Sequence, residues 1–162
     1  MIPTALLTSV ADELTKQHLL IATAESCTGG LLAHLLTNIS GSSVYFDRGV
    51  VTYSNTAKTA LLGVPRDLLN QFGAVSEQTA AAMAVGIRQH AAVDIGISTT
   101  GIAGPTGGTP EKPVGLVYIG LATGKTVTVK RFVFSGDRLA NKESTCTAAL
   151  QLLLETVTRK KS

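Results

Sequence analysis

The sequence contains few residues of the kinds that mark specialised classes of protein. Its 162 residues include no tryptophan, aromatic residues make up 4%, and charged residues make up 15%. With so few aromatic side chains, the core must be built from Leu, Val, Ile and Ala. The hydrophobic share of 44% still indicates a folded globular chain rather than a disordered one. The length predicts a single domain over residues 1–162.

Cysteine and concentrated positive charge are also scarce. The two cysteines, Cys27 and Cys146, lack zinc-site spacing and have no histidines clustered near them. We therefore expect neither a disulfide framework nor a metal or other cofactor. The net charge is +3, and part of it comes from the run at 159–161. Since no basic stripe is interleaved with aromatic residues, we expect no nucleic-acid partner, and a small anionic ligand fits better.

Long apolar runs are missing as well. The first residues include Asp12 and Glu13 and show no basic region followed by an apolar block, so no signal peptide is expected. No run reaches the length that a membrane span needs. The expectation is a cytoplasmic protein with no membrane partner.

Alternating β-type and α-type segments follow one another along the chain. Helical spacing of apolar residues predicts helices near 4–18, 31–38, 56–62, 65–71, 76–91 and 138–158. Short apolar or β-branched runs predict strands at 19–23, 48–53, 93–100, 114–122 and 126–134, the last at a sheet edge with a bulge near Lys130. Alternation of this kind requires a mostly parallel sheet covered on both faces. The predicted fold is a three-layer α/β/α sandwich with a mostly parallel five-stranded sheet carrying one antiparallel strand.

Three polar segments directly follow predicted strands. They are the turn at 24–30, the junction at 53–55 and the glycine-rich loop at 101–108. In an open α/β sheet, ligands bind beyond the carboxyl ends of the strands. We expect these three segments to gather at one end of the sheet and to form a site.

The turn at 24–30 holds a hydroxyl and a thiol side by side. Ser26 and Cys27 sit between an apolar strand and a predicted helix, with Gly29 and Gly30 after them. A helix beginning here would point unbonded N–H groups at the turn, which suits a nucleophile and an oxyanion. Ser and Thr caps with a Gly-Gly turn explain the same residues without any chemistry.

A serine nucleophile needs a base, and no His-Asp pair lies at the strand ends. Lys58 lies one helical turn beyond the second strand and could reach back towards Ser26, with its pKa lowered by desolvation. A solvated helix lysine is the ordinary alternative. Tyr53 ends an apolar strand, so its hydroxyl must find a polar partner near that edge. Cys27 remains a rival nucleophile, although it could point into the core.

The segment at 101–108 has four glycines in eight residues. Successive backbone N–H groups in such a loop can hold an anion. The pattern is neither a Walker loop nor a dinucleotide fingerprint. A flexible loop with no ligand is an equally good interpretation.

Several short motifs, in order along nearly the whole chain, resemble those of the CinA C-terminal domain family. They are AESCTGG (24–30), GSS (41–43), VTYSN (51–55) followed by Lys58, GAVSE (73–77), TGIAGPTGG (100–108), EKPVG (111–115) and SGDR (135–138). The resemblance implies an α/β/α fold and, in the stand-alone members, hydrolysis of nicotinamide mononucleotide to nicotinate mononucleotide and ammonia. By the same resemblance, the family's serine, lysine and tyrosine correspond to Ser26, Lys58 and Tyr53.

These considerations give a defined set of expected site residues. Catalysis is expected from Ser26, Lys58 and Tyr53, with Tyr53 assisting or orienting the lysine. Substrate binding is expected from Thr28, Gly29, Gly30, Ser43, Thr100, Gly101, Gly104 and Arg138. Backbone N–H groups at 28–30 would hold the oxyanion, and the glycine loop with Arg138 or Ser43 would hold the phosphate. We expect a homo-oligomer, with a dimer favoured. The competing hypothesis is a binding module of the same fold that holds a phosphorylated ligand without turnover.

Overall fold

The structure, a computed structural model, describes residues 2–159, so the basic residues 160 and 161 of the predicted tail lie outside it. Its helices are α1 (Thr4–Lys16), α2 (Leu31–Leu36), the 3-10 helix η1 (Ser42–Val44), α3 (Asn55–Leu62), α4 (Arg66–Phe72), α5 (Glu77–Ala91) and α6 (Arg138–Arg159). Its strands are β1 (Ile21–Glu25), β2 (Phe46–Val51), β3 (Ile95–Gly101), β4 (Leu116–Ala122) and β5 (Val127–Val133). Each predicted element is present, with ends that differ by a few residues.

The strands form one sheet in the order β2-β1-β3-β4-β5. Strand β1 pairs in parallel with both β2 and β3, while β4 is antiparallel to β3 and to β5. Only β4 therefore runs against the others, as the sequence predicted. Because the strand order places β1 between two parallel neighbours, the carboxyl ends of β1, β2 and β3 meet at one edge.

The prediction of a β-bulge near Lys130 is wrong. The pairing of β4 with β5 runs without a shift from Leu116 opposite Val133 to Ala122 opposite Val127. Strand β5 is an edge strand with mostly exposed side chains, so burial does not enforce an alternating pattern on its sequence. The register shift lies instead between β1 and β2, next to Ile21.

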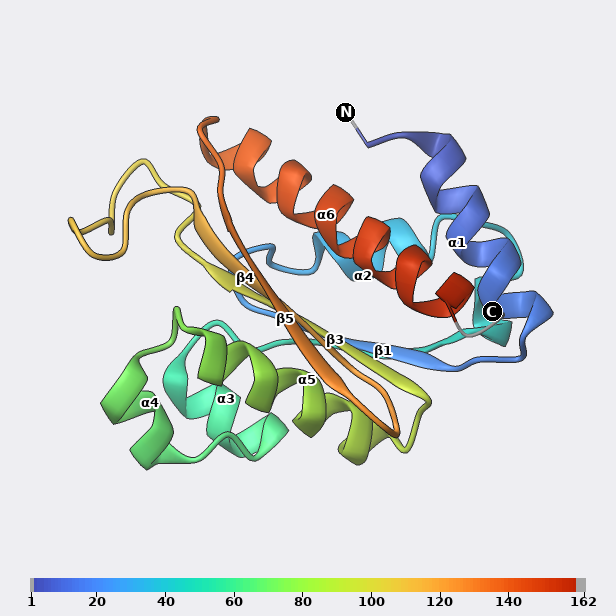
Figure 1. The fold of residues 1–162 in the computed structure, drawn as a ribbon, viewed down its shortest axis with the longest axis horizontal. Helices are drawn as coiled ribbons and strands as arrows, with labels where there is room; N and C mark the ends of the chain where they lie inside the picture. Colours follow the sequence, from blue (N-terminus) through green and yellow to red (C-terminus); the bar gives the residue numbers. More distant parts are fainter. Residues whose placement is uncertain (1, 160–162) are drawn as a thin grey trace.

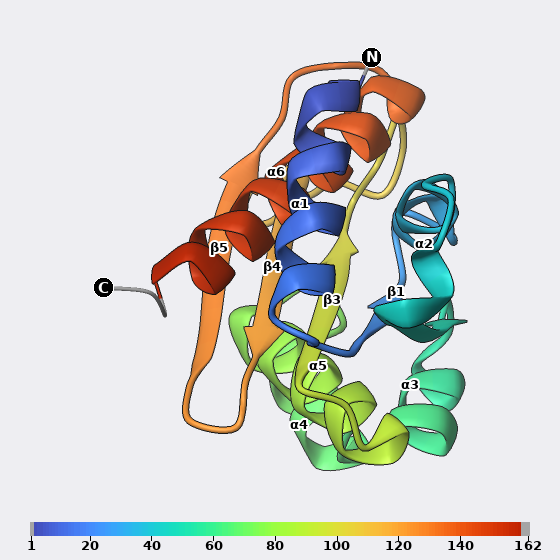
Figure 2. The same cartoon turned by 90° about the vertical axis from the view of Figure 1, so that its right-hand side faces the viewer.

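Helices cover both faces of the sheet in separate layers. Figures 1 and 2 show α1, α2 and α6 on one face and α3, α4 and α5 on the other. The first face is filled by an aliphatic cluster that includes Leu14, Leu32 and Leu153, and the second by a smaller cluster that includes Leu62 and Met83. This confirms the three-layer α/β/α sandwich with an aliphatic core.

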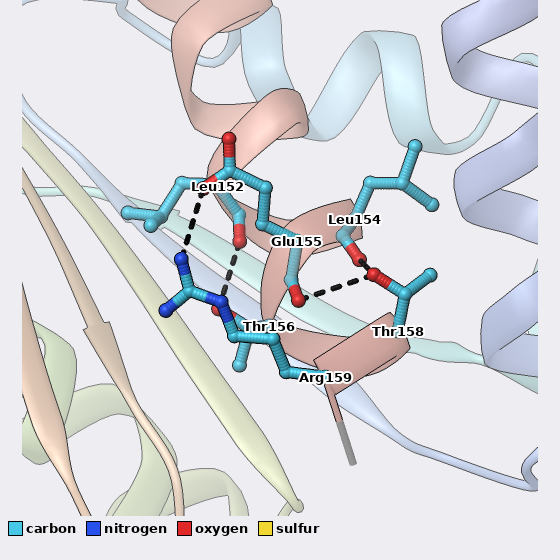
Figure 3. Close-up of polar contacts among 6 residues, drawn as sticks. All are labelled: Leu152, Leu154, Glu155, Thr156, Thr158 and Arg159. Atoms are coloured by element: carbon cyan, nitrogen blue, oxygen red, sulfur yellow. Dashed lines mark hydrogen bonds and ion pairs between the residues drawn. The ribbon is translucent and has the colours of Figure 1, made fainter. Parts of the chain in front are cut away.

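Helix α6 begins at the edge where the parallel strands end and finishes far from it. Figure 3 shows its last turns, where the hydroxyls of Thr156 and Thr158 donate to carbonyls four residues back. Glu155 and Arg159 form an exposed ion pair of 3.9 Å there, which contributes little to stability. None of the helices within residues 2–159 combines the length and apolar content that crossing a membrane requires.

The close contact between α5 and α3 predicts that one substitution in α5 lowers the stability of the protein. A Cβ on Gly86 would lie 2.1 Å from the carbonyl oxygen of Leu62, which is backbone and cannot move aside cheaply. Gly86→Ala should therefore lower the free energy of unfolding by about 1–3 kcal/mol, measured by urea denaturation. Helix propensity alone would instead raise it by roughly 1 kcal/mol. The exposed Gln89→Ala in the same helix is the control, with a change within about 0.5 kcal/mol. A Gly86→Ala protein more stable than its parent would contradict the packing argument.

Candidate active site

The structure brings Lys58 and Ser26 into direct contact. Lys58 Nζ donates a hydrogen bond to Ser26 Oγ at 3.1 Å and another to the carbonyl oxygen of Thr52 at 2.9 Å. Both side chains are buried, with relative exposures of 1% for Lys58 and 9% for Ser26. The prediction that the lysine reaches back over the strand end to the serine is confirmed. A solvated helix lysine, the alternative interpretation, is wrong.

Parallel pairing of β1 with β2 explains how residues 32 positions apart meet. Glu25 lies opposite Val51, and the ladder extends one step further because Thr52 N–H donates to the Glu25 carbonyl at 2.8 Å. Ser26 N–H donates to Thr99 O at 2.9 Å and so fixes the turn to β3. The chain then turns back at once into α3, whose N-cap Ser54 accepts from Ala57 N–H.

Burial sets the protonation tendency of Lys58. Its pKa is lowered from the ordinary lysine value because burial disfavours the ammonium form, and only the nearby Cys27 thiolate would oppose this shift. Two hydrogen-bond acceptors, Ser26 Oγ and Thr52 O, hold the amine in place. Lys58 is therefore a lysine that reaches its neutral form more easily than an exposed one.

Cys27 is poorly suited to be the nucleophile. It is buried with a relative exposure of 6%, and its pKa is raised to about 12, chiefly because burial disfavours the thiolate. Lys58 donates to the Ser26 hydroxyl and not to this thiol. The geometry thus favours Ser26 over Cys27.

Glu25 is a buried carboxylate that the sequence analysis did not single out. It accepts hydrogen bonds from the Thr28 hydroxyl at 2.6 Å, Leu32 N–H at 2.8 Å and Ala33 N–H at 3.1 Å. The Thr28 hydroxyl also lies 2.7 Å from that of Thr99. The positive end of α2 is thus occupied by Glu25, and the expectation that these helix N–H groups face a ligand is wrong. A charged residue directly before Ser26, in the turn at 24–30, was the only sign of this in the sequence.

The turn itself still offers backbone donors. Gly29 N–H donates to the Ser26 carbonyl at 3.1 Å, whereas the N–H groups of Thr28 and Gly30 donate to no other residue within 2–159. Gly29 and Gly30 have φ values of +61° and +101°, which L side chains rarely adopt. Consecutive amides in such a conformation can form a concave anion site.

Tyr53 and Arg138 contact each other next to the glycine loop. Arg138 donates to the Tyr53 hydroxyl at 2.8 Å and to the Gly104 carbonyl at 2.8 Å. Tyr53 is 60% exposed, and its hydrogen bond is with Arg138 rather than with Lys58. The start of α6 is also tied to the glycine loop by Asn141, which donates to Ala103 O at 3.0 Å. The three polar segments thus gather at one sheet edge, as predicted.

Two predicted binding residues are committed to the protein's own structure. The hydroxyl of Thr100 donates to the Ala74 carbonyl at 2.7 Å, and Gly101 pairs with Val117 in the sheet. Only the backbone around them remains to contact a ligand.

Ser43 lies away from the other predicted site residues. It is exposed in η1, which precedes β2, whereas the end of β2 at Val51 pairs with Glu25 beside Ser26. Ser43 therefore precedes the start of β2, whereas Ser26 lies beside the end of β2. The prediction that Ser43 helps to bind the substrate of Ser26 does not hold within a single chain, because sequence position does not show at which end of a strand a loop lies.

Comparison with known proteins identifies the family of the chain. The family model of the CinA C-terminal domain matches residues 3–157. The chain belongs to this family. A CinA-like protein of Syntrophus aciditrophicus is 55% identical over 146 residues, which are 90% of this chain and 35% of that protein. The chain thus spans about a third of the length of the curated relatives it matches.

Solved structures of the family share the fold. The competence/damage inducible protein CihA from Agrobacterium tumefaciens is 40% identical, with a TM-score of 0.91 over 96% of this chain and 97% of that one. A CinA superfamily protein from Klebsiella pneumoniae is 35% identical, with a TM-score of 0.92 over 96% of this chain and 97% of that one. Within residues 2–159, no group of three or more His, Cys, Asp and Glu side chains could hold a metal ion.

The buried cap makes a testable contribution to stability. Glu25→Gln keeps the shape but replaces one acceptor oxygen by an NH₂ group, which leaves a buried N–H of α2 without an acceptor. We expect the free energy of unfolding to fall by about 1–3 kcal/mol in urea denaturation. The exposed Glu77→Gln, in the first turn of α5, is the matched control and should cost less than about 1 kcal/mol. Equal losses in the two variants would show that Glu25 acts only as a surface charge would.

Proposed function

We propose that this chain is an amidohydrolase that converts nicotinamide mononucleotide to nicotinate mononucleotide and ammonia. The observation that carries the proposal is the buried 3.1 Å hydrogen bond between Lys58 Nζ and Ser26 Oγ at the carboxyl ends of parallel strands. A hydroxyl paired with a lysine of lowered pKa is an activated nucleophile. The resemblance of the motifs supplies the substrate.

The reaction would be an acyl transfer in two stages. Ser26 Oγ attacks the carboxamide carbon while neutral Lys58 takes the hydroxyl proton, with Thr52 O holding the amine in position. The amide oxygen becomes an oxyanion near the N–H groups of Thr28 and Gly30. Protonated Lys58 then gives its proton to the leaving nitrogen, which departs as ammonia. Water, deprotonated by Lys58, attacks the acyl-serine. The bond between the acyl carbon and Ser26 Oγ then breaks, Lys58 returns the proton to Ser26 Oγ, and the carboxylate is released.

The substrate's own charge would assist both partners. The pyridinium ring withdraws electrons from the carboxamide and makes its carbon more electrophilic. The same positive charge disfavours an ammonium nearby, which would lower the pKa of Lys58 further. The loop at 101–108, with Arg138 bonded to its Gly104 carbonyl, would lie against the ribose of the nucleotide.

The site of action and the assembly are parts of the same proposal. We place the activity in the cytoplasm and favour a homodimer. Strand β2 is at the edge of the sheet, with Val51 46% exposed and Val44 58% exposed beside it. An uncovered edge of this kind invites pairing with another chain. Sedimentation of the purified protein measures the assembly directly.

The nucleophile can be assigned with two neighbouring substitutions. Ammonia release from nicotinamide mononucleotide should fall by roughly 10³-fold or more in Ser26→Ala, because within residues 2–159 Lys58 Nζ is hydrogen-bonded to no other hydroxyl. Cys27→Ala should retain most of the activity and is the matched control. Loss in the cysteine variant with activity retained in the serine variant would reverse the assignment. Nucleotide binding without any ammonia release by the parent would identify a binding module instead.

The base can be tested through pH. Since Lys58 acts only when neutral, kcat/KM should rise with pH through a group titrating below the value of about 10.4 of a free lysine. Lys58→Arg keeps the positive charge but cannot deprotonate, so it should be as inactive as Lys58→Ala. The exposed Lys125→Arg, in the hairpin between β4 and β5, should retain activity. Near-normal turnover by Lys58→Arg would make Lys58 a positioning residue and would exclude it as the base.

A further inference from the structure

A second lysine lies beside the turn of Ser26 and has no role in the chemistry above. Lys142 Nζ is 3.5 Å from the position that a Cβ on Gly29 would occupy. The side chain is half-buried, and within residues 2–159 it has neither a hydrogen bond nor an ion pair. A partly desolvated ammonium with three unused donors is a place where an anion can bind.

The fold holds this ammonium in a defined position. Lys142 lies one helical turn after Arg138, so both cations are on the same side of α6. The start of α6 is fixed to the glycine loop by Arg138 on Gly104 O and by Asn141 on Ala103 O. Figure 1 shows α6 crossing above the sheet with α2 beside it. Lys142 thus bridges the space between α6 and the turn that carries the nucleophile.

Among the charged groups around the turn, Lys142 is the cation that is still available to bind an anion. Glu25 already accepts three hydrogen bonds, and Lys58 is committed to Ser26 and Thr52. Burial raises the pKa of the Cys27 thiol, and the positive charge of Lys142 offsets part of that rise. The positive charge of Lys142 is therefore close enough to the turn to influence its electrostatics.

We propose that Lys142 binds the phosphomonoester end of the substrate and so determines specificity for the nucleotide over the riboside. The substrate is the one named under the proposed function, on which this inference rests. The Ser26–Gly29 turn closes with a 3.1 Å hydrogen bond, which keeps its end Cα atoms within about 7 Å. A ligand that reacts at Ser26 and extends past Gly29 brings its far, anionic end to Lys142. Arg138 already uses its guanidinium on Tyr53 and Gly104, whereas Lys142 uses none of its donors on the described chain.

Steady-state kinetics with two substrates tests this assignment. For Lys142→Met, KM for nicotinamide mononucleotide should rise about 10- to 100-fold while kcat stays within about 3-fold. The same variant should process nicotinamide riboside, which lacks the phosphate, with unchanged kinetics. Lys142→Arg should restore most of the nucleotide affinity because it keeps the charge. The exposed Lys130→Met on β5 removes an equal charge far from the turn and should change neither substrate.

Three outcomes would overturn the assignment. Equal losses in kcat/KM for nucleotide and riboside would mean that Lys142 acts on the reacting amide, and no loss for either would mean that it does not contact substrate. Calorimetric binding of nicotinate mononucleotide to the parent and to Lys142→Met gives a readout without turnover. A parent that binds nicotinate mononucleotide but releases no ammonia from nicotinamide mononucleotide would refute the proposed function alone, and weaker binding by Lys142→Met would still support the phosphate contact. Equal binding of nicotinate mononucleotide by the parent and by Lys142→Met would refute the phosphate contact.

Discussion

The placement of one buried amine constrains most of this site. Lys58 can be buried only because two oxygens, Ser26 Oγ and Thr52 O, accept its hydrogen bonds. An unpaired amine at this depth would cost several kcal/mol. To supply both acceptors, β1 and β2 must be parallel neighbours, and α3 must begin directly after β2. The sheet order and the early start of α3 are thus tied to the same contact.

A buried carboxylate, Glu25, directly precedes the nucleophile in the chain and caps the helix that follows. Glu25 takes the positive end of α2 for structure, so this helix dipole is not available to an oxyanion. The catalytic donors we propose are instead the amides of Thr28 and Gly30, in a turn whose glycines have positive φ. The N–H groups of Leu32 and Ala33 thus hold α2 on Glu25, whereas those of Thr28 and Gly30 donate to no other residue within 2–159.

Helix α6 joins the two halves of the site. Its first turns carry Arg138, Asn141 and Lys142, which contact the glycine loop or approach the Ser26 turn. Its later turns pack Leu150 and Leu153 into the core on the same face of the sheet. The packing of these later turns thus fixes the angle at which the first turns of α6 bring Arg138 and Lys142 to the site.

The sequence by itself determined the elements, their alternation and the sheet edge at which polar segments meet. Apolar periodicity and strand–turn–helix order are local properties, so they survive without knowledge of the partners. This was enough to predict the pairing of Ser26 with Lys58, since both lie within a few residues of adjacent strand ends. It was not enough to place Ser43, which lies in η1 before the start of β2, whereas the Ser26 turn lies beside the end of β2.

Only the tertiary structure decided which side chain contacts which. In the structure, the Tyr53 hydroxyl accepts a hydrogen bond from Arg138 and has none with Lys58. The Glu25 side chain is buried and accepts a hydrogen bond from an N–H group of α2. The tertiary structure also brought Lys142 to Gly29 across more than a hundred residues of chain. Contacts of this kind depend on the strand register and on the angle at which a helix packs. Both are set by the whole core, and neither is a property of any short segment.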